Sequence, residues 1–166
     1  MSAGDNPSNP KPDRDLTKLA PKFRDAVQRA IAACNDPTGL NANAMVYEGF
    51  RTLELQQIYY ARGRTVIPPT HTVTNAPTNL YSWHGYGLAV DIVHATQFWT
   101  PPGGEAWFKA VAAVFKQNGC NWGGDWTHPD TPHMQWGQCK PSPSDEARKL
   151  LATGGVAAVW KAVGAD

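Results

Sequence analysis

Apolar residues recur at three- and four-residue steps in two segments of the chain, which is the spacing of an amphipathic helix. The first stripe consists of Leu16, Leu19, Phe23, Val27, Ile31 and Cys34. The second consists of Trp107, Val111, Val114 and Phe115. They predict one helix that ends before the turn-forming residues 36–39, and another over 105–118 with Gly119 as its C-terminal cap. Both stripes are expected to form core and not a functional site.

Shorter patterns predict the remaining elements, which are strands over 45–49, 88–93 and 134–136, a helix over 52–62, and closing helices over 144–152 and 156–163. The closing helices are separated by Gly154 and Gly155. Residues 65–81 contain three prolines and two asparagines with little periodicity, which is typical of a long loop that lines a site.

The chain has 166 residues, which suits one compact domain. Its start is rich in proline, asparagine and glycine, so we expect a flexible leader over residues 1–14 and a single domain over 15–166. Hydrophobic residues at 42% and charged residues at 17% exclude a wholly disordered chain and membrane insertion. A net charge of +1 argues against nucleic acid as a partner. Three cysteines without CxxC spacing predict buried free thiols.

Two of the five histidines, His84 and His133, stand in segments rich in glycine or proline, which are the residues that allow or impose turns in the backbone. A catalytic zinc site needs three protein ligands and an open position, and His84, Asp91 and His133 could supply the ligands. A straight strand would separate His84 from Asp91 by about 23 Å. Gly85 and Gly87 could allow a sharp turn between them. The spacing by itself leaves open that these are unrelated loop residues.

Three sequence blocks together resemble a known family. They are Ser-x-His-x-x-Gly-x-Ala-x-Asp at 82–91, Gly-Gly-Asp-Trp at 123–126 with Asp-x-Pro-His at 130–133, and an upstream segment over 49–65. This combination resembles the zinc peptidases of bacterial cell walls, a family that joins D-alanyl-D-alanine carboxypeptidases to the L-alanyl-D-glutamate endopeptidases of phage endolysins. The resemblance covers about residues 15–164, and the second block is more similar to the endopeptidase branch.

The resemblance implies an α+β fold of the hedgehog and D-Ala-D-Ala peptidase type, with a small antiparallel sheet packed with helices around an open zinc cleft. It implies one Zn²⁺ per chain, bound by His84, Asp91 and His133. It further implies that Asp130 is the catalytic carboxylate and that Arg51 polarises or anchors the substrate. No calcium site is expected, because residues 92–122 contain only one acidic side chain.

Residues beside these positions are expected to bind substrate. The family pattern places Gln56 and Ser82 near the pocket, and Trp83, Tyr86 and Trp126 flank the ligands, so they are expected to wall the groove. Several polar residues have less specific interpretations. Asp125 is interpreted as a turn cap with a catalytic alternative, His128 as a hydrogen-bond donor near the metal, and His71 and His94 as solvated or supporting side chains.

The function implied is that of an endopeptidase that cleaves the L-alanyl-D-glutamate bond of peptidoglycan stem peptides. The first eighteen residues lack the apolar core of a secretory signal. We therefore expect a monomeric phage endolysin, made in the host bacterial cytoplasm, that acts on the wall after release and lyses the host. Two alternatives are a D-alanyl-D-alanine carboxypeptidase, which would normally carry a signal or anchor, and a non-catalytic wall-binding zinc module, which would lack Asp130 or Arg51.

Overall fold

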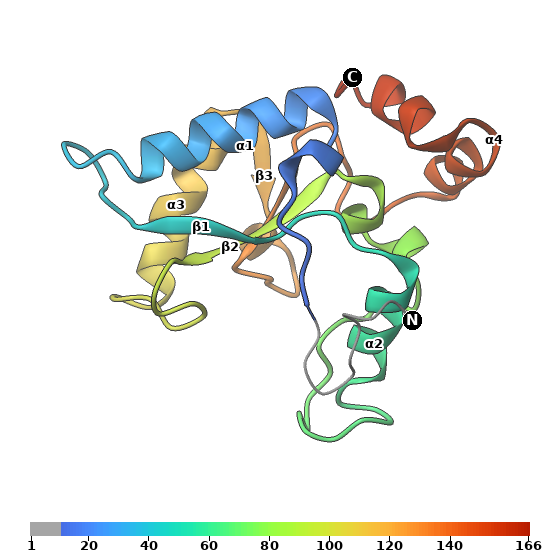
Figure 1. Ribbon diagram of the computed structural model, residues 1–166, viewed down its shortest axis with the longest axis horizontal. Helices are drawn as coiled ribbons and strands as arrows, with labels where there is room; N and C mark the ends of the chain where they lie inside the picture. The colour runs from blue at the N-terminus through green and yellow to red at the C-terminus, as the bar shows by residue number, and fades with distance from the viewer. Residues whose placement is uncertain (1–10) are drawn as a thin grey trace.

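The computed structural model describes residues 11–166 (Figure 1). Most of the predicted leader, 1–14, therefore lies outside the described residues. The last two residues of that segment are attached to the domain: the carbonyl of Asp13 accepts a hydrogen bond from the Gly49 amide, and Arg14 Nε donates to the carbonyl of Tyr47. No helix within residues 11–166 has the length and apolar character needed to cross a membrane.

A four-stranded antiparallel sheet with the order β1-β2-β4-β3 forms the centre of the fold. Its strands are β1 (Ala44–Glu48), β2 (Ala89–His94), β3 (Cys120–Trp122) and β4 (His133–Trp136). Together with the helices it gives the expected α+β class. Asp91 on β2 is in register with Glu48 on β1 and with His133 on β4. An irregularity between Val46 and Glu48 sets this pairing at the end of β1.

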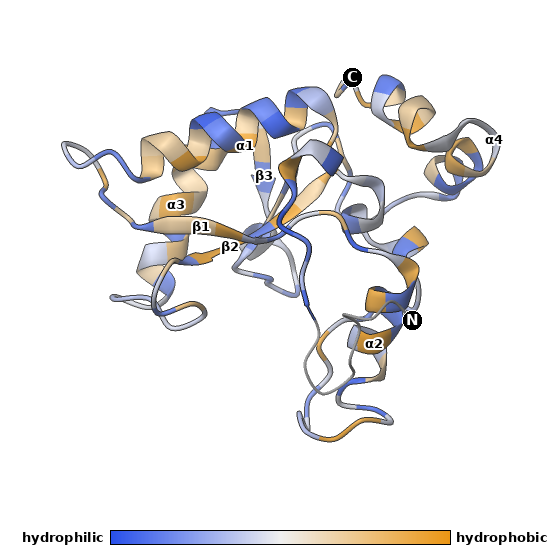
Figure 2. Cartoon of the chain, in the orientation of Figure 1, coloured by the Kyte–Doolittle hydropathy of each residue, from blue (hydrophilic) through white to orange (hydrophobic). Residues whose placement is uncertain are grey.

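Helices α1 (Pro21–Cys34) and α3 (Glu105–Gln117) pack against each other and against the sheet. Their predicted apolar stripes supply much of the hydrophobic core, which they share with Val90 and Ile92 of β2. In Figure 2, β1 and β2 are mostly hydrophobic, whereas α1 alternates between hydrophilic and hydrophobic residues. Because side chains alternate along a strand, Asp91 points away from the face that Val90 and Ile92 bury.

Two elements beside the sheet complete the cleft. Helix α2 (Leu53–Ala61) begins at Thr52, whose side chain accepts a hydrogen bond from the amide of Leu55, close to the predicted start. Apart from an isolated bridge between Arg62 and Val66, the following segment has no regular structure until the short 3₁₀ helix η2 (Asn79–Tyr81), which occupies the end of the loop expected over 65–81. Figure 1 shows α2 and this loop on the side of the sheet away from α1.

The closing segment is α4 (Asp145–Ala162), which is broken at Gly155. Gly155 has φ 69° and ψ −173°, values that no helix contains. The prediction of two closing helices separated by glycines is therefore confirmed.

A short 3₁₀ helix, η3 (Trp83–Tyr86), carries His84 and was not predicted. It ends at Gly87, which adopts the left-handed conformation with φ 68°. A Cβ atom at Gly87 would lie 2.7 Å from the carbonyl oxygen of Lys18, so only glycine fits there. This tight helix and turn replace the straight strand, and they return the chain so that His84 reaches Asp91.

The three cysteines, Cys34, Cys120 and Cys139, are buried and unpaired, which confirms the prediction of free thiols. Burial raises the pKa of Cys34 to about 11 and those of Cys120 and Cys139 to about 12. These thiols therefore stay protonated at neutral pH and take no part in the chemistry of the cleft.

Candidate metal centre and active-site cleft

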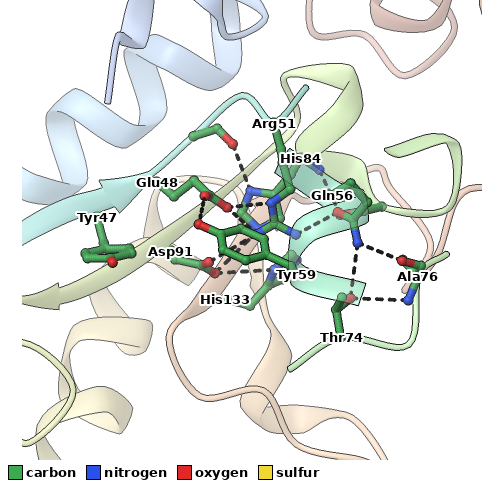
Figure 3. Close-up of polar contacts among 12 residues, drawn as sticks. Tyr47, Glu48, Arg51, Gln56, Tyr59, Thr74, Ala76, His84, Asp91 and His133 are labelled. Atoms are coloured by element: carbon green, nitrogen blue, oxygen red, sulfur yellow. Dashed lines mark hydrogen bonds and ion pairs between the residues drawn. The ribbon is translucent and has the colours of Figure 1, made fainter. Parts of the chain in front are cut away.

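His84, Asp91 and His133 converge at one point of the sheet, where they offer three ligand atoms within 4.8 Å of one another. Asp91 Oδ1 lies 3.5 Å from Nε2 of His84 and 3.7 Å from Nδ1 of His133. Asp91 and His133 meet because they are partners in the β2–β4 register, and His84 arrives from η3. Figure 3 shows the three side chains pointing toward one another.

The second ring nitrogen of each histidine is held by an acceptor. His84 Nδ1 lies 2.9 Å from the carbonyl oxygen of Gly49, and His133 Nε2 lies 2.8 Å from Oε1 of Gln135. Gln135 is itself oriented, because its Nε2 donates to the carbonyl of Lys140. In the neutral imidazoles each of these ring nitrogens carries the proton, so the neutral form of each histidine turns an unprotonated nitrogen toward Asp91.

Two nitrogen lone pairs and one carboxylate oxygen therefore face one another at this point. Such a set of acceptors suits a cation, because it contains no hydrogen-bond donor of its own. The outer hydrogen bonds to Gly49 and Gln135 are those that orient metal-binding histidines. The residues present thus fit a metal ion.

Charge and burial act in opposite directions on Asp91. Burial by itself would raise the pKa of this carboxyl group, but the positive charge of His84 and His133 in their protonated forms, with the hydrogen bonds they then donate, outweighs it and holds the pKa well below its usual range. Asp91 is therefore an anion at neutral pH. The pKa of Asp130 is raised, first by burial and then by the negative charge of Asp91.

Asp130 lies at the edge of the centre, in the segment that leads into β4. Its Oδ2 is 3.9 Å from His133 Nδ1, and half of its side chain is exposed to the cleft. The Asp130 amide donates to the carbonyl of Gly123, 2.9 Å away. A Cβ atom at Gly123 would lie 2.5 Å from the carbonyl oxygen of Asp130, so glycine permits this close approach.

Asp125, the alternative carboxylate, lies in η4 (Gly123–Asp125) and points elsewhere. It forms an ion pair with Lys116 on α3 and does not line the cleft. The geometry thus places Asp130, and not Asp125, beside the candidate metal ligands. The expected turn cap by Asp125 is replaced by this ion pair.

Arg51 is buried against the same centre by a network that the sequence analysis missed. Its Nε and Nη2 donate to Oε1 of Glu48, and its Nη1 donates to Oε1 of Gln56 at 2.8 Å. Tyr59 donates its hydroxyl hydrogen bond to the second oxygen of Glu48 at 2.7 Å. Arg51 Nη2 also lies 3.7 Å from Asp91 Oδ2. The sequence signal that could have indicated this network is Glu48, a carboxylate at the end of a predicted strand and three residues before Arg51.

Two of the predicted substrate-binding residues do not reach the cleft surface. Gln56 is completely buried, and its Nε2 donates to the carbonyl of Ala76, so it ties the long loop to Arg51. Tyr86 is also completely buried, in the core, and packs edge-on against Trp83. The prediction that Tyr86 walls the groove is therefore wrong, and Gln56 supports the site from behind.

The other predicted residues do line a cleft of about 950 Å³. Ser82, Trp83 and Trp126 lie in its wall, with the Trp126 ring centroid 4.9 Å from that of His133. His71 and His128 are also in the wall and lie outside the converging group. His94, expected to be solvated or supporting, is buried and accepts hydrogen bonds from the amides of the turn that follows β2.

Comparison with known proteins places the chain among peptidases. A family model described as D-alanyl-D-alanine carboxypeptidase matches residues 75–136, the segment that contains His84, Asp91, Asp130 and His133. The chain is 29% identical over 131 residues to the peptidoglycan L-alanyl-D-glutamate endopeptidase CwlK of Bacillus subtilis strain 168, covering 73% of each protein.

Over this segment the chain is similar to this family of peptidases. A crystal structure of the Serratia marcescens L-Ala D-Glu endopeptidase ChiX is also similar, with a TM-score of 0.49 and 20% identity. That match covers 76% of this chain and 86% of the ChiX chain. The residues that converge in the cleft lie in the segment that matches the family model.

Glu48→Gln is predicted to destabilise the protein by about 2 to 4 kcal/mol, because it removes the carboxylate that accepts from two nitrogens of the buried Arg51 and leaves only the more distant Asp91 as its anion. The matched control is Asp145→Asn. Asp145 also pairs with an arginine three residues later, but its side chain is 91% exposed, so the loss should stay below about 1 kcal/mol. The measurement is the free energy of unfolding in urea. Equal losses for the two variants would contradict the importance of the buried network.

Proposed function

We propose that this peptidase is a zinc-dependent endopeptidase that hydrolyses the L-alanyl-D-glutamate bond of peptidoglycan stem peptides. The observation that carries the proposal is the convergence of His84, Asp91 and His133 beside Asp130 in an open cleft. The similarity to CwlK supports the choice of substrate and bond.

The donor set favours zinc over other common metals. Two imidazole nitrogens and one carboxylate oxygen, with an open position toward the cleft, are typical of catalytic zinc, whereas calcium and magnesium prefer oxygen ligands alone. A zinc ion held by these residues would lower the pKa of a bound water toward about 7 and would polarise the scissile carbonyl.

Asp130 is assigned the proton transfers. As the new bond forms between the water oxygen and the carbonyl carbon, Asp130 takes the proton of the water, and it returns that proton to the amine nitrogen when the carbon–nitrogen bond breaks. Its position suits this role, because its carboxylate stands next to His133 Nδ1 yet is half exposed to the cleft. Three protein ligands remain without it.

Arg51 is assigned a supporting electrostatic role. Its Nε, Nη1 and Nη2 atoms donate to Glu48 and Gln56, so the guanidinium is a fixed positive charge beside Asp91 and not a mobile anchor. Charge that develops on the substrate in the cleft is therefore met by a group that does not need to reorganise.

A carboxypeptidase specific for D-alanyl-D-alanine is the second candidate, favoured by the description of the matching family model. The endolysin role in host lysis, with action on the wall after release from the host cytoplasm, is a further part of the proposal and is supported by the motif resemblance alone. A purely wall-binding module is disfavoured, because Arg51 and Asp130 both lie at the cleft.

Digestion of purified peptidoglycan, with mass analysis of the products, separates the candidates. The endopeptidase is expected to release peptides that begin with D-glutamate and to leave L-alanine on the sugar. Release of free D-alanine alone would transfer the assignment to the carboxypeptidase. Absence of any product, with metal bound, would favour the binding module.

Asp130→Asn is predicted to keep stoichiometric zinc while kcat falls by about 10² to 10⁴, because the variant retains the shape of the side chain but loses the proton acceptor. Metal content and kcat are measured on the same sample. Asp125→Asn is the control, since its carboxylate pairs with Lys116 outside the cleft and kcat should be retained. If the control variant lost activity and Asp130→Asn did not, the roles of the two aspartates would be reversed.

A further inference from the structure

A second arginine, Arg62, lines the same cleft and has no partner among the described residues. It follows α2 as the C-terminal cap residue and is partly buried. Its Nε is fully buried and makes no hydrogen bond. Within residues 11–166, no carboxylate forms an ion pair with its guanidinium.

The neighbouring arginines are engaged. Arg51 donates to Glu48 and Gln56 from three of its nitrogens. Arg64 does not line the cleft, and its Nη1 donates to the carbonyls of Tyr60 and Thr74 at 2.6 and 3.0 Å. Arg62 is therefore the arginine in the cleft whose terminal nitrogens are available to a ligand.

A buried donor without an acceptor is unfavourable in the folded protein, and it is rare in native structures. Its Nε is enclosed, but the terminal nitrogens of the same guanidinium also make no hydrogen bond within residues 11–166 and are not enclosed, so a ligand in the cleft can supply acceptors to them. A guanidinium is best matched by a planar anion with two oxygens, such as a carboxylate, which it can bind through two parallel hydrogen bonds.

Arg62 lines the same cleft as Arg51, which lies beside the candidate metal ligands. Arg51 lies next to Asp91, and its guanidinium carbon is 4.7 Å from the centroid of the Tyr59 ring (Figure 3). Tyr59, near the end of α2, lines the cleft as Arg62 does. Arg51, Tyr59 and Arg62 therefore line the same cleft as the candidate metal ligands.

The proposed substrate carries a carboxylate close to the scissile bond. A glutamate residue has two carboxyl groups and is joined to the next residue through only one of them, so the other is free. We propose that Arg62 binds this free carboxylate and makes the peptidase prefer glutamate to its carboxamide form. The inference rests on the proposed function, because it takes glutamate as the residue that follows the cleaved bond.

The test uses two synthetic peptides that differ at one group. Both are N-acetyl-L-alanyl-D-glutamyl-L-lysine amides joined through the γ-carboxyl of glutamate. One has the free α-carboxylate and the other the α-carboxamide. The wild-type zinc enzyme is expected to show a kcat/KM about 10- to 100-fold higher for the carboxylate peptide. This is the usual effect of losing one hydrogen bond between charged groups.

Arg62→Gln is expected to bring this ratio to within about threefold of unity, mainly through KM for the carboxylate peptide. Arg62→Lys keeps the charge without the planar fork and should give an intermediate ratio, and it carries the same test if the glutamine variant does not fold. Arg64→Gln is the control and should keep the wild-type ratio.

The outcomes separate this inference from the proposed function. Cleavage of the carboxylate peptide between alanine and glutamate, with a ratio that neither Arg62 variant changes, would overturn the role of Arg62 and leave the proposed function standing. Failure of the wild-type zinc enzyme to cleave either peptide at that bond would overturn the proposed function, and the inference with it.

Discussion

Strand β2 pairs Asp91 with Glu48 on one side and with His133 on the other, and the chemistry of the cleft depends on this register. Directly paired residues on neighbouring antiparallel strands hold their Cβ atoms about 4.5 to 5.5 Å apart. A shift of either pairing by one residue would turn a side chain to the opposite face and separate the ligands. The helices that pack on the sheet therefore stabilise the site, because they hold the strands in this register.

The same register buries a negative charge behind the candidate metal centre. Glu48 is 1% exposed and is held by Arg51 and Tyr59, and Arg51 in turn reaches Asp91 and Gln56. Gln56 connects this group to Ala76 in the long loop that walls the cleft. The network thus joins the metal ligands, α2 and the loop, so that the cleft wall and the site are positioned together.

Much of the fold could be predicted from the sequence, because long apolar periodicities outweigh local ambiguity. Both core helices and the glycine break in the closing segment follow from such patterns. Strand β3, of only three residues, is too short to give a periodic signal. The burial of Glu48 could not be predicted either, since it depends on the irregular β1–β2 pairing.

The candidate ligands could be named in advance because their motif is specific, whereas the surroundings depend on local geometry. Tyr86 lies two residues after His84, but in a 3₁₀ helix of three residues per turn that spacing points the side chains in different directions. Tyr86 instead aligns with Trp83, three residues earlier, and their ring centroids lie 5.2 Å apart in the core. Proximity in sequence to a ligand therefore does not place a side chain in the cleft.

The central claim is that one zinc ion is held by His84, Asp91 and His133. X-ray diffraction from crystals of the zinc-loaded protein, recorded above and below the zinc absorption edge, tests it directly. The account predicts a single anomalous peak within about 2.0 to 2.2 Å of His84 Nε2, Asp91 Oδ1 and His133 Nδ1, with Asp130 outside the coordination shell. A peak at any other residues, or one coordinated by Asp130 in place of Asp91, would contradict it.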